Sequence, residues 1–552
     1  MQSRKPKTME EVSKIQNDIL VSGPRTTVKK PVQWMGYLPI LLVIVGAFAV
    51  LGLRIEIGPR FVSDGALMML ALACYILAAL FQLTNLYAPS GMAEKIGFYG
   101  ACLGVFFNFS SWLVRWVAAY EREISQMRLA GNPDSPWVFR YIPFANLYDL
   151  SLAFAFGAGI ATILFARRSN FRVLTAFTLP LAALILTLAR FIGNEFIDLP
   201  PVLDSYWRPI HVGDASLSYG IALVCFAVAV IYLLKDGLKV EAMAIWSSIF
   251  SLAVIGTISK FSVFSAFVYR ASLFVPTGAG KKPFTAPFRL DVPYVGPTLV
   301  LASLLLLGSI AAFLLYLYRN NEQAKTYGHY LLKAGFVAQI IAIAFLISGL
   351  QNNADVNVRL RAQLAANPSQ YITGGMSLAG SEGLTAQEYS AITPTQFDQT
   401  GRDFVNNNGP QMFLSLSANP VEFSALITAA VATFFVLLFS FRTEKLRERL
   451  PSLESLDSLM YKTACLAFAG LAMLLITGAI WANESWGRPW GFDSKETGAL
   501  IAWLTYAAFL HTRISRGWKG RSSAYFAIIG FLLVIFTYLG VSYLIPGLHS
   551  YA

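Results

Sequence analysis

Residues 481–497 read Trp-Ala-Asn-Glu-Ser-Trp-Gly-Arg-Pro-Trp-Gly-Phe-Asp-Ser-Lys-Glu-Thr and join the apolar stretches 462–482 and 496–513. A connection that only joined two helices would favour small polar residues. This one carries three tryptophans and a phenylalanine. An ordinary interfacial aromatic belt is the plainer interpretation. It accounts for scattered tryptophans, but not for Trp-Gly-x-x-Trp-x-aromatic-Asp in one loop. The segment therefore indicates a surface on which a large flat ligand stacks.

The same segment contains a signal for the start of a helix. Asp493 is followed three residues later by Glu496, which is the spacing of an N-cap and capping box. We therefore expect the next helix to begin directly after the aromatic residues and to hold them still.

Composition predicts an all-α, polytopic membrane protein. The chain is 56% hydrophobic and 13% charged, with a mean hydropathy of +0.55. Apolar stretches of about 20 residues, enough to cross a bilayer as helices, recur along it. We expect about thirteen spans, at 33–53, 66–86, 97–119, 147–166, 173–192, 215–234, 243–267, 295–318, 330–350, 421–441, 462–482, 496–513 and 523–545.

A net charge of +12 would by itself suggest a nucleic-acid partner. The positions of the basic residues indicate a different explanation. They gather in alternate connections, at Arg4, Lys5, Lys7, Lys29, Lys30, Arg167, Arg168, Arg172, Arg442, Lys445, Arg447, Arg449, Arg513, Arg516, Lys519 and Arg521. The positive-inside rule makes that side cytoplasmic. The N-terminus is then cytoplasmic, the C-terminus and the aromatic loop lie on the outer face, and no nucleic-acid partner is expected.

The positions of the cysteines argue against disulfide and thiol-exchange chemistry. The four cysteines, Cys74, Cys102, Cys225 and Cys465, all fall in predicted spans, and none forms a C-x-x-C pair. We expect neither a disulfide framework nor a thiol-exchange motif. Since C-x-x-C-H is also absent, the chain carries no covalently attached c-type heme of its own.

The four histidines suggest what the ligand is. His211, just outside the sixth span, and His549, just outside the last, lie on the outer face, while His511 and His329 lie at inner-leaflet depth. Heme iron takes axial imidazole ligands, and an outer pair beside an aromatic loop suits a transiently held heme. A solvated interfacial histidine is the alternative for each residue, and His511 could simply favour a helix C-terminus. For His329 the plain structural interpretation is preferred.

These features resemble the tryptophan-rich WWD family of heme-handling proteins. Asp493-Ser-Lys-Glu-Thr is most similar to the CcsA (ResC) branch of system II cytochrome c biogenesis. Phe492 departs from the family, which usually has a third tryptophan there. The run Leu-Asp-Ser-Tyr-Trp before His211, the run Leu-His-Thr-Arg around His511 and the ending Gly-Leu-His-Ser-Tyr around His549 also look like family segments.

The resemblance implies roles for these residues. His211 and His549 would be external axial ligands of heme iron, and His511 a ligand of a membrane-embedded heme. Trp486, Trp490, Phe492 and Asp493 would bind the ring. Which arginine meets the propionates stays open among Arg115, Arg190, Arg208 and Arg488.

The resemblance also implies an activity. The chain would bind heme b, present it on the outer face and help attach it to the C-x-x-C-H segment of apocytochrome c. The thiols add to the vinyl groups, as in a cytochrome c heme lyase. A CcsB (ResB)-type membrane protein would be a separate partner. The implied location is a bacterial cytoplasmic membrane or a thylakoid membrane.

The resemblance divides the chain into parts. They are a cytoplasmic tail (1–32), additional spans (33–94), a first core part with His211 (95–240), inserted spans (241–450) and a C-terminal core (451–552). The insertion contains an external loop, 351–420, rich in Asn, Gln, Ser, Thr, Gly and Pro. That loop is either a small domain or a largely irregular segment.

Two other functions remain open. One is heme transport or chaperoning without ligation, as in CcmC- or CcmF-like relatives of the motif. The other is an unrelated transporter, which predicts internal repeats and helices broken near the midplane. No repeat is evident, and Pro180 is the one obvious candidate for a break.

Overall fold

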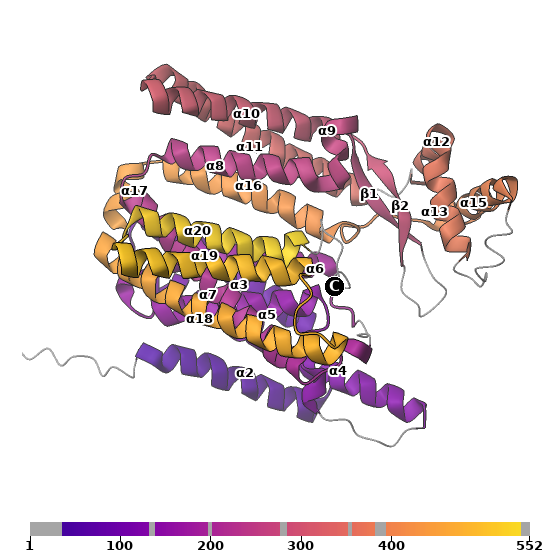
Figure 1. Cartoon of the computed structure of the whole chain (residues 1–552), viewed down its shortest axis with the longest axis horizontal. Coiled ribbons are helices and arrows are strands. Elements are labelled where there is room, and N and C mark those ends of the chain that lie inside the picture. Colours follow the sequence, from indigo (N-terminus) through magenta and orange to yellow (C-terminus); the bar gives the residue numbers. More distant parts are fainter. Residues whose placement is uncertain are drawn as a thin grey trace, which may run out of the picture.

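The computed structural model describes residues 36–131, 138–196, 201–275, 284–351, 356–380 and 393–541. Long helices run side by side along the longest axis of the molecule (Figure 1). Their bounds are α2 (Leu38–Ile57), α3 (Asp64–Tyr87), α4 (Gly91–Leu129), α5 (Leu147–Ala166), α6 (Leu174–Ile192), α7 (Trp207–Lys235), α8 (Val240–Thr257), α10 (Val295–Arg319), α11 (Glu322–Gln351), α16 (Pro420–Ser440), α18 (Leu453–Trp486), α19 (Ser494–Arg516) and α20 (Arg521–Ile535).

The predicted class, an all-α polytopic membrane protein, is confirmed. Each predicted span contains a helix, and twelve helices in the described residues are long and apolar enough to cross a membrane. The helix outside that group is α19, which packs along α18 and α20. Its mean hydropathy is lowered by the polar residues of its first and last turns, around Lys495 and Arg513.

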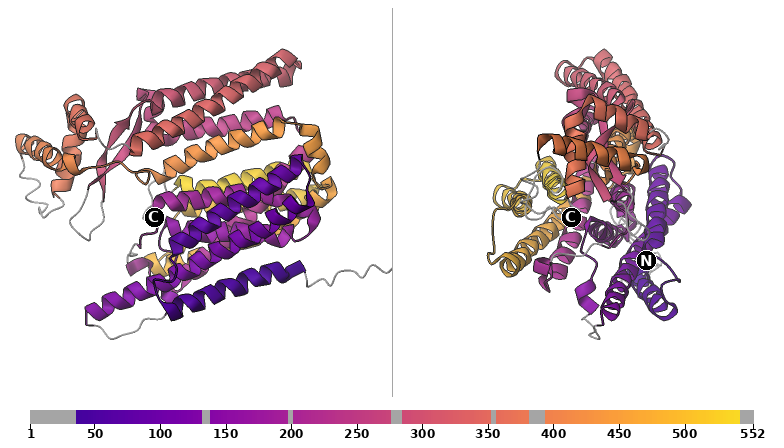
Figure 2. Two further views of the ribbon diagram at one scale, coloured as in Figure 1. Left: turned by 180° about the vertical axis from the view of Figure 1, so that it is seen from behind. Right: turned by 90° about the vertical axis from the view of Figure 1, so that its right-hand side faces the viewer.

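The helices form two groups that lie side by side (Figures 1 and 2). The larger group contains α3 to α7 and α18 to α20, and the smaller contains α8, α10, α11 and α16. Helix α16 joins them by packing on α6. The rings of Phe191 and Phe423 lie 4.5 Å apart across this contact, and those of Phe177 and Phe439 stack at 5.4 Å. Aromatic pairs therefore attach the smaller group to the larger.

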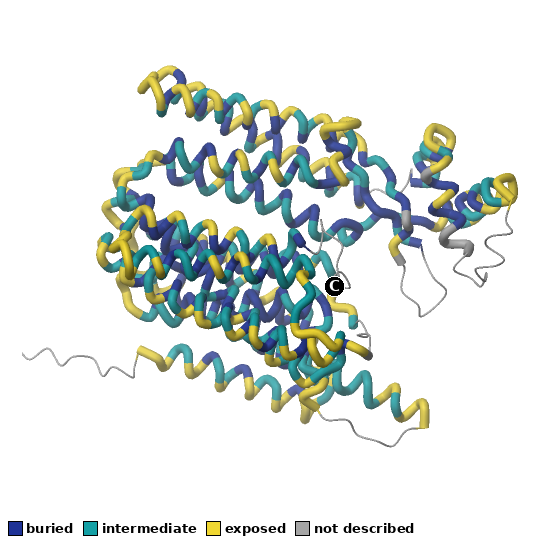
Figure 3. Tube along the Cα trace, in the orientation of Figure 1, coloured by how far each residue is buried: buried dark blue, intermediate teal, exposed yellow. Residues whose placement is uncertain are grey.

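Burial separates the inside of the larger group from its surroundings. Buried residues gather on α5, α6 and α7, while α2 and α10 carry many exposed positions (Figure 3). The exposed positions are apolar, such as Leu42 at 61% and Leu304 at 62%. Exposed aliphatic side chains along a helix of spanning length are expected where lipid replaces water.

Helices α5 and α7 meet through glycine. A Cβ on Gly157 would lie 2.5 Å from Ser216 O, and one on Gly220 would lie 2.2 Å from Gly157 C. Such close backbone contact is typical of helix pairs in membranes. It sets the position of α7, the helix that carries His211.

Several helices extend beyond their apolar stretches, because capped polar turns continue them. The Ser452 hydroxyl accepts a hydrogen bond from Ser455 N, so α18 begins at Leu453 rather than near 462. Helix α7 begins at Trp207. His211 therefore lies within the helix, in its second turn, rather than in the connection that precedes it. The end of α7 with His211 and the end of α18 with Trp486 lie at one end of the bundle, which we call the aromatic end.

The helical structure is interrupted at a place that the sequence did not indicate. Helix α6 continues through Pro180. The break follows α8, where Ser259, Lys260 and Phe261 take left-handed backbone conformations with φ of 55°, 50° and 66°. A short helix, α9 (Ser262–Ala266), then leads into an antiparallel hairpin, β1 (Tyr269–Val275) and β2 (Phe284–Val292). The hairpin is an unpredicted exception to the all-α class.

Residues from the 351–420 segment pack on that hairpin (Figure 2). The described part contains α12 (Val356–Ala366), α13 (Pro368–Gly380) and α15 (Pro394–Asn408). Tyr371 on α13 lies with its ring 5.2 Å from that of Phe288, and its hydroxyl donates to Arg289 O at 2.6 Å. A further short helix, α17 (Thr443–Arg449), lies at the opposite end of the bundle.

Candidate functional site

His211 packs against α18 from the second turn of α7. Its Nδ1 lies 3.0 Å from Leu474 O and 3.3 Å from Thr477 Oγ1. Gly478 makes room for the ring, because a Cβ there would lie 2.8 Å from His211 Cε1. The side chain is half-buried. Glycine within an apolar helix is the local signal for this contact, but its partner is 267 positions away in the sequence.

The contact with Leu474 fixes the tautomer of the imidazole. A carbonyl oxygen only accepts hydrogen bonds, so Nδ1 carries the hydrogen and donates to Leu474 O. The lone pair of a neutral ring then belongs to Nε2. A backbone carbonyl on one ring nitrogen and a metal on the other is the usual arrangement of a metal-binding histidine. The residue therefore has the chemistry of an iron ligand.

A cluster of aromatic side chains lies beside this histidine and contacts it through Trp481. The His211 and Trp481 rings lie 5.7 Å apart. Trp481 is 6% exposed and belongs to a small core cluster that is separate from the main core. The other aromatic members come from α4, the segment before α5, the start of α7 and the end of α18: Trp112, Phe144, Trp207 and Trp486.

Two indole nitrogens in this cluster have no acceptor among the described residues. Trp481 Nε1 and Trp112 Nε1 are buried and make no hydrogen bond within the described residues. A buried donor without a partner costs free energy. The combination of unmatched donors, aromatic faces and a histidine with its lone pair on Nε2 fits a flat metal-containing ligand with acceptor groups, such as heme.

The predicted capping box at Asp493 is present. The Asp493 carboxylate accepts from the backbone of the first turn of α19, and the Glu496 carboxylate accepts from Gly491 N at 2.8 Å and Asp493 N at 3.2 Å. These bonds fix the loop that follows Trp486. Phe492 sits in the left-handed region, with φ of 54°, a strained conformation for a bulky residue.

The three aromatic residues of the loop differ in their surroundings. Trp486 packs against the core cluster. Phe492 is 78% exposed, and its ring meets that of the half-buried Trp490 edge to face at 6.0 Å. The Arg488 guanidinium folds over Gly491, where a Cβ would lie 1.8 Å from Nη1. The loop thus offers two aromatic rings and one arginine outside the packed core.

A second link joins the start of α7 to the end of α18. Ser205 Oγ donates to Glu484 Oε2 at 2.7 Å, just before α7 and near the end of α18. Arg208 is buried, and its Nη2 donates to Arg140 O at 2.6 Å. Arg140 in turn pairs with Asp204. The start of α7 is therefore anchored on both sides.

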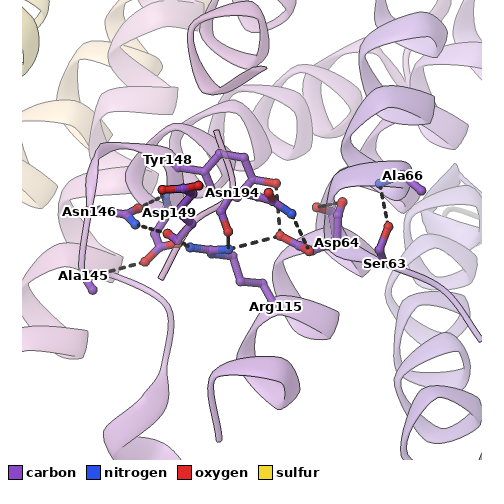
Figure 4. A network of polar contacts seen from close by, with 11 residues as sticks. Ser63, Asp64, Ala66, Arg115, Ala145, Asn146, Tyr148, Asp149 and Asn194 are labelled. Atoms are coloured by element: carbon purple, nitrogen blue, oxygen red, sulfur yellow. Dashed lines mark hydrogen bonds and ion pairs between the residues drawn. The ribbon is translucent and has the colours of Figure 1, made fainter. Parts of the chain in front are cut away.

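Arg115 is fully buried in a polar network at the aromatic end (Figure 4). It pairs with Asp149 and, at 3.2 Å, with Asp64. Its Nη1 also donates to Asn194 O at 2.7 Å, and Tyr148 OH donates to Asp64 at 3.1 Å. The network joins α3, α4 and α5 to the turn after α6. Because two carboxylates already surround its guanidinium, Arg115 is a poor candidate for binding a propionate.

His511 lies near the other end of α19. It is 17 residues past Ser494, about 26 Å along the helix, and it is exposed. Its neighbour Arg513 pairs with Asp457, 3.0 Å away, and lies over the Tyr461 ring. That arginine therefore holds α19 to α18.

His329 lies in the smaller helix group. Its Nε2 is 3.1 Å from Glu241 Oε1, and its ring meets Phe313 edge to face at 5.0 Å. Its contacts favour the structural interpretation. His549 lies outside the described residues.

Comparison with known proteins gives one family and partial relatives. The family described as "Cytochrome C assembly protein" matches residues 144–275 and 298–549. A "Cytochrome c biogenesis protein CcsA" of Prochlorococcus marinus (strain MIT 9515) is 58% identical over 98 residues, 18% of this chain and 31% of that one. The protein with the same description from Trichormus variabilis (strain ATCC 29413 / PCC 7937) is 37% identical over 217 residues, 39% of this chain and 56% of that one.

The chain thus spans about a third to just over half of the length of these curated relatives. Among solved structures, a "Cytochrome c Heme Lyase CcmF" aligns over 89% of this chain and 73% of its own, with 14% identity and a TM-score of 0.27.

Proposed function

This chain belongs to the family of cytochrome c assembly proteins, and from that premise we propose that it acts in c-type cytochrome biogenesis. Its part is to hold heme at the aromatic end of the bundle and present it to an apocytochrome. The observation that carries the proposal is the hydrogen bond from His211 Nδ1 to Leu474 O, beside the Trp481 ring.

His211 would bind the iron through Nε2. The bond to Leu474 O orients the ring and increases the basicity of the ligating nitrogen. His549 is proposed as the ligand on the opposite face, from the resemblance of the Gly-Leu-His-Ser-Tyr ending to the family. An imidazole from the substrate's C-x-x-C-H segment would displace one of the two.

The loop between α18 and α19 would hold the rest of the ring. Trp490 and Phe492 present apolar faces for stacking, and the capping box of Asp493 and Glu496 keeps them in place. Arg488 is the arginine best suited to a propionate, because it lies in the loop and folds over Gly491.

Covalent attachment needs little acid–base chemistry from the protein. Each cysteine S–H of the apocytochrome adds across a heme vinyl group, so that a C–S bond forms and the hydrogen ends on the neighbouring carbon. The iron and both thiols must be reduced beforehand. The residues of the aromatic end would contribute position and exclude water. Heme delivery without ligation is the second candidate, and it uses the same residues.

The orientation follows from the charge pattern. With the basic connections in the cytoplasm, the aromatic end faces the outside, where c-type cytochromes would be completed. His511 would then lie near the inner leaflet as a ligand of an entering heme b. Because this histidine is exposed, we propose that the second imidazole comes from a CcsB-type partner chain rather than from His329.

Co-expression with a C-x-x-C-H reporter tests the proposal. His211→Ala should lose holocytochrome formation, and added imidazole should partly restore it by replacing the missing iron ligand. His329→Ala is the matched control, because it removes a histidine from the smaller helix group and should leave the yield unchanged. Full reporter maturation with His211→Ala would remove this residue from the mechanism.

The same experiment separates ligation from delivery. Reporter heme that stays attached in denaturant, in cells that have no other assembly system, supports ligation. Heme that co-purifies with the protein but never becomes covalent supports delivery alone. Omitting the CcsB-type chain tests whether the partner is required.

A further inference from the structure

A cavity of about 780 Å³ lies at the end of the bundle opposite the aromatic end. The connection between α5 and α6 forms one wall, and the first turns of α18 form the other. It is lined by Phe165, Arg167, Arg168, Ser169, Asn170, Phe171, Glu454, Ser455, Ser458, Leu459 and Lys462. Nothing in the proposed heme chemistry uses this cavity.

The lining is basic, and two of its cations, both exposed, lack an ion-pair partner among the described residues. Arg168 and Lys462 form no ion pair within the part of the chain that the structure describes, and Glu454 is the one carboxylate in the lining. Arg167 donates to Tyr37 OH at 2.7 Å, which directs it towards α2. Arg172, four residues after Arg168, pairs instead with Glu94 at 3.0 Å. The cavity therefore keeps uncompensated positive charge.

Apolar and hydroxyl groups stand beside these cations. Phe165, Phe171 and Leu459 supply the apolar part, and Ser169 and Ser458 are among the hydroxyl donors. Cations and hydroxyls together suit a phosphate. A free phosphate would gain nothing from the apolar wall, whereas a lipid has glycerol and acyl carbons to place there.

The depth of the cavity also fits a lipid. Helix α5 is apolar to its end at Ala166, and the wall formed by α18 precedes its apolar stretch at 462–482. The cavity thus lies where a spanning bundle meets the headgroups. We propose that it binds the phosphate headgroup of an anionic phospholipid, bridging the α5–α6 connection and the start of α18.

Native mass spectrometry of the delipidated full-length protein tests this, with phosphatidylglycerol as the probe. The double variant Arg168→Gln, Lys462→Gln should bind the lipid about thirtyfold more weakly at its tightest site, from two lost cation contacts. The control Lys445→Gln, Arg449→Gln removes the same charge from exposed positions of α17 at the same end, and should bind like the parent. Arg168→Lys with Lys462→Arg should keep binding, which shows that charge rather than folding is responsible.

Three results would overturn the proposal. One is unchanged lipid binding by the neutral double variant, and another is an equal loss in the control. The third is displacement of the lipid by glycerol phosphate or inorganic phosphate at matching concentration, because the site would then select a free anion. Phosphatidylcholine, which carries no net charge, should bind no better to the parent than to the neutral variant.

Discussion

Replacing Gly478 by alanine should displace the His211 ring while leaving the imidazole itself unchanged. A Cβ at this position would lie 2.8 Å from His211 Cε1 and 3.1 Å from its Nδ1. Carbon atoms in contact normally stay about 3.5 Å apart or more, so the ring has to move by roughly 0.7 Å. Nδ1 would move with it, away from the 3.0 Å hydrogen bond to Leu474 O.

The size of the effect follows from these two contacts. Overpacking of a filled helix contact costs about 1–3 kcal/mol of stability. Loss of the hydrogen bond that orients a metal-binding imidazole lowers metal affinity about 10- to 100-fold. We therefore expect heme retention to fall by that factor while the protein stays folded.

The assay is the heme content and absorption spectrum of the purified protein, together with the yield of a C-x-x-C-H reporter. Gly470→Ala is the matched control. It lies on the same helix, and its Cβ would meet Ser218 Oγ at 2.0 Å rather than the histidine. Wild-type heme content in Gly478→Ala, or an equal loss in Gly470→Ala, would refute the claim that α18 positions His211.

Three further outcomes are expected. Trp490→Ala should reduce the heme content of the purified protein through lost stacking area. Phe492→Trp should be tolerated, because it keeps a large ring on the same left-handed backbone. Wild-type heme content in Trp490→Ala would refute the stacking argument. Arg115→Leu should destabilise the protein by about 3–5 kcal/mol, measured as unfolding in detergent, since it leaves two buried carboxylates without their cation. His511→Ala should abolish the absorption of heme at the inner face and His329→Ala should leave it unchanged; loss of the signal in His329→Ala would instead make that residue the second ligand.

Local signals in the sequence determined much of this protein. The apolar stretches predicted every long helix, because twenty apolar residues in lipid must satisfy their backbone groups within one helix. The capping box at Asp493 and Glu496 was readable because its partners lie within one turn. The aromatic loop and the histidine contexts pointed to heme through resemblance to a family, and the family match supports that direction.

Helix ends and breaks were less predictable. Helix α7 starts at Trp207, before its apolar stretch, so His211 lies within the helix. The left-handed residues after α8 and the hairpin that follows carry no glycine or proline signal at Ser259–Phe261. Arg270 N of β1 donates to Ser259 Oγ at 2.6 Å, which ties this turn to the hairpin. Hydropathy does not report such a contact.

Only the tertiary structure decided what the site residues touch. The Nδ1 partner of His211 is 263 residues away, and the carboxylate partners of Arg115 come from two other helices. The sequence left four arginines open as propionate partners, and burial of Arg115 between carboxylates weakened the case for one of them. Periodicity and composition describe one element at a time, whereas the tautomer of a histidine and the charge balance of an arginine depend on which helices pack together.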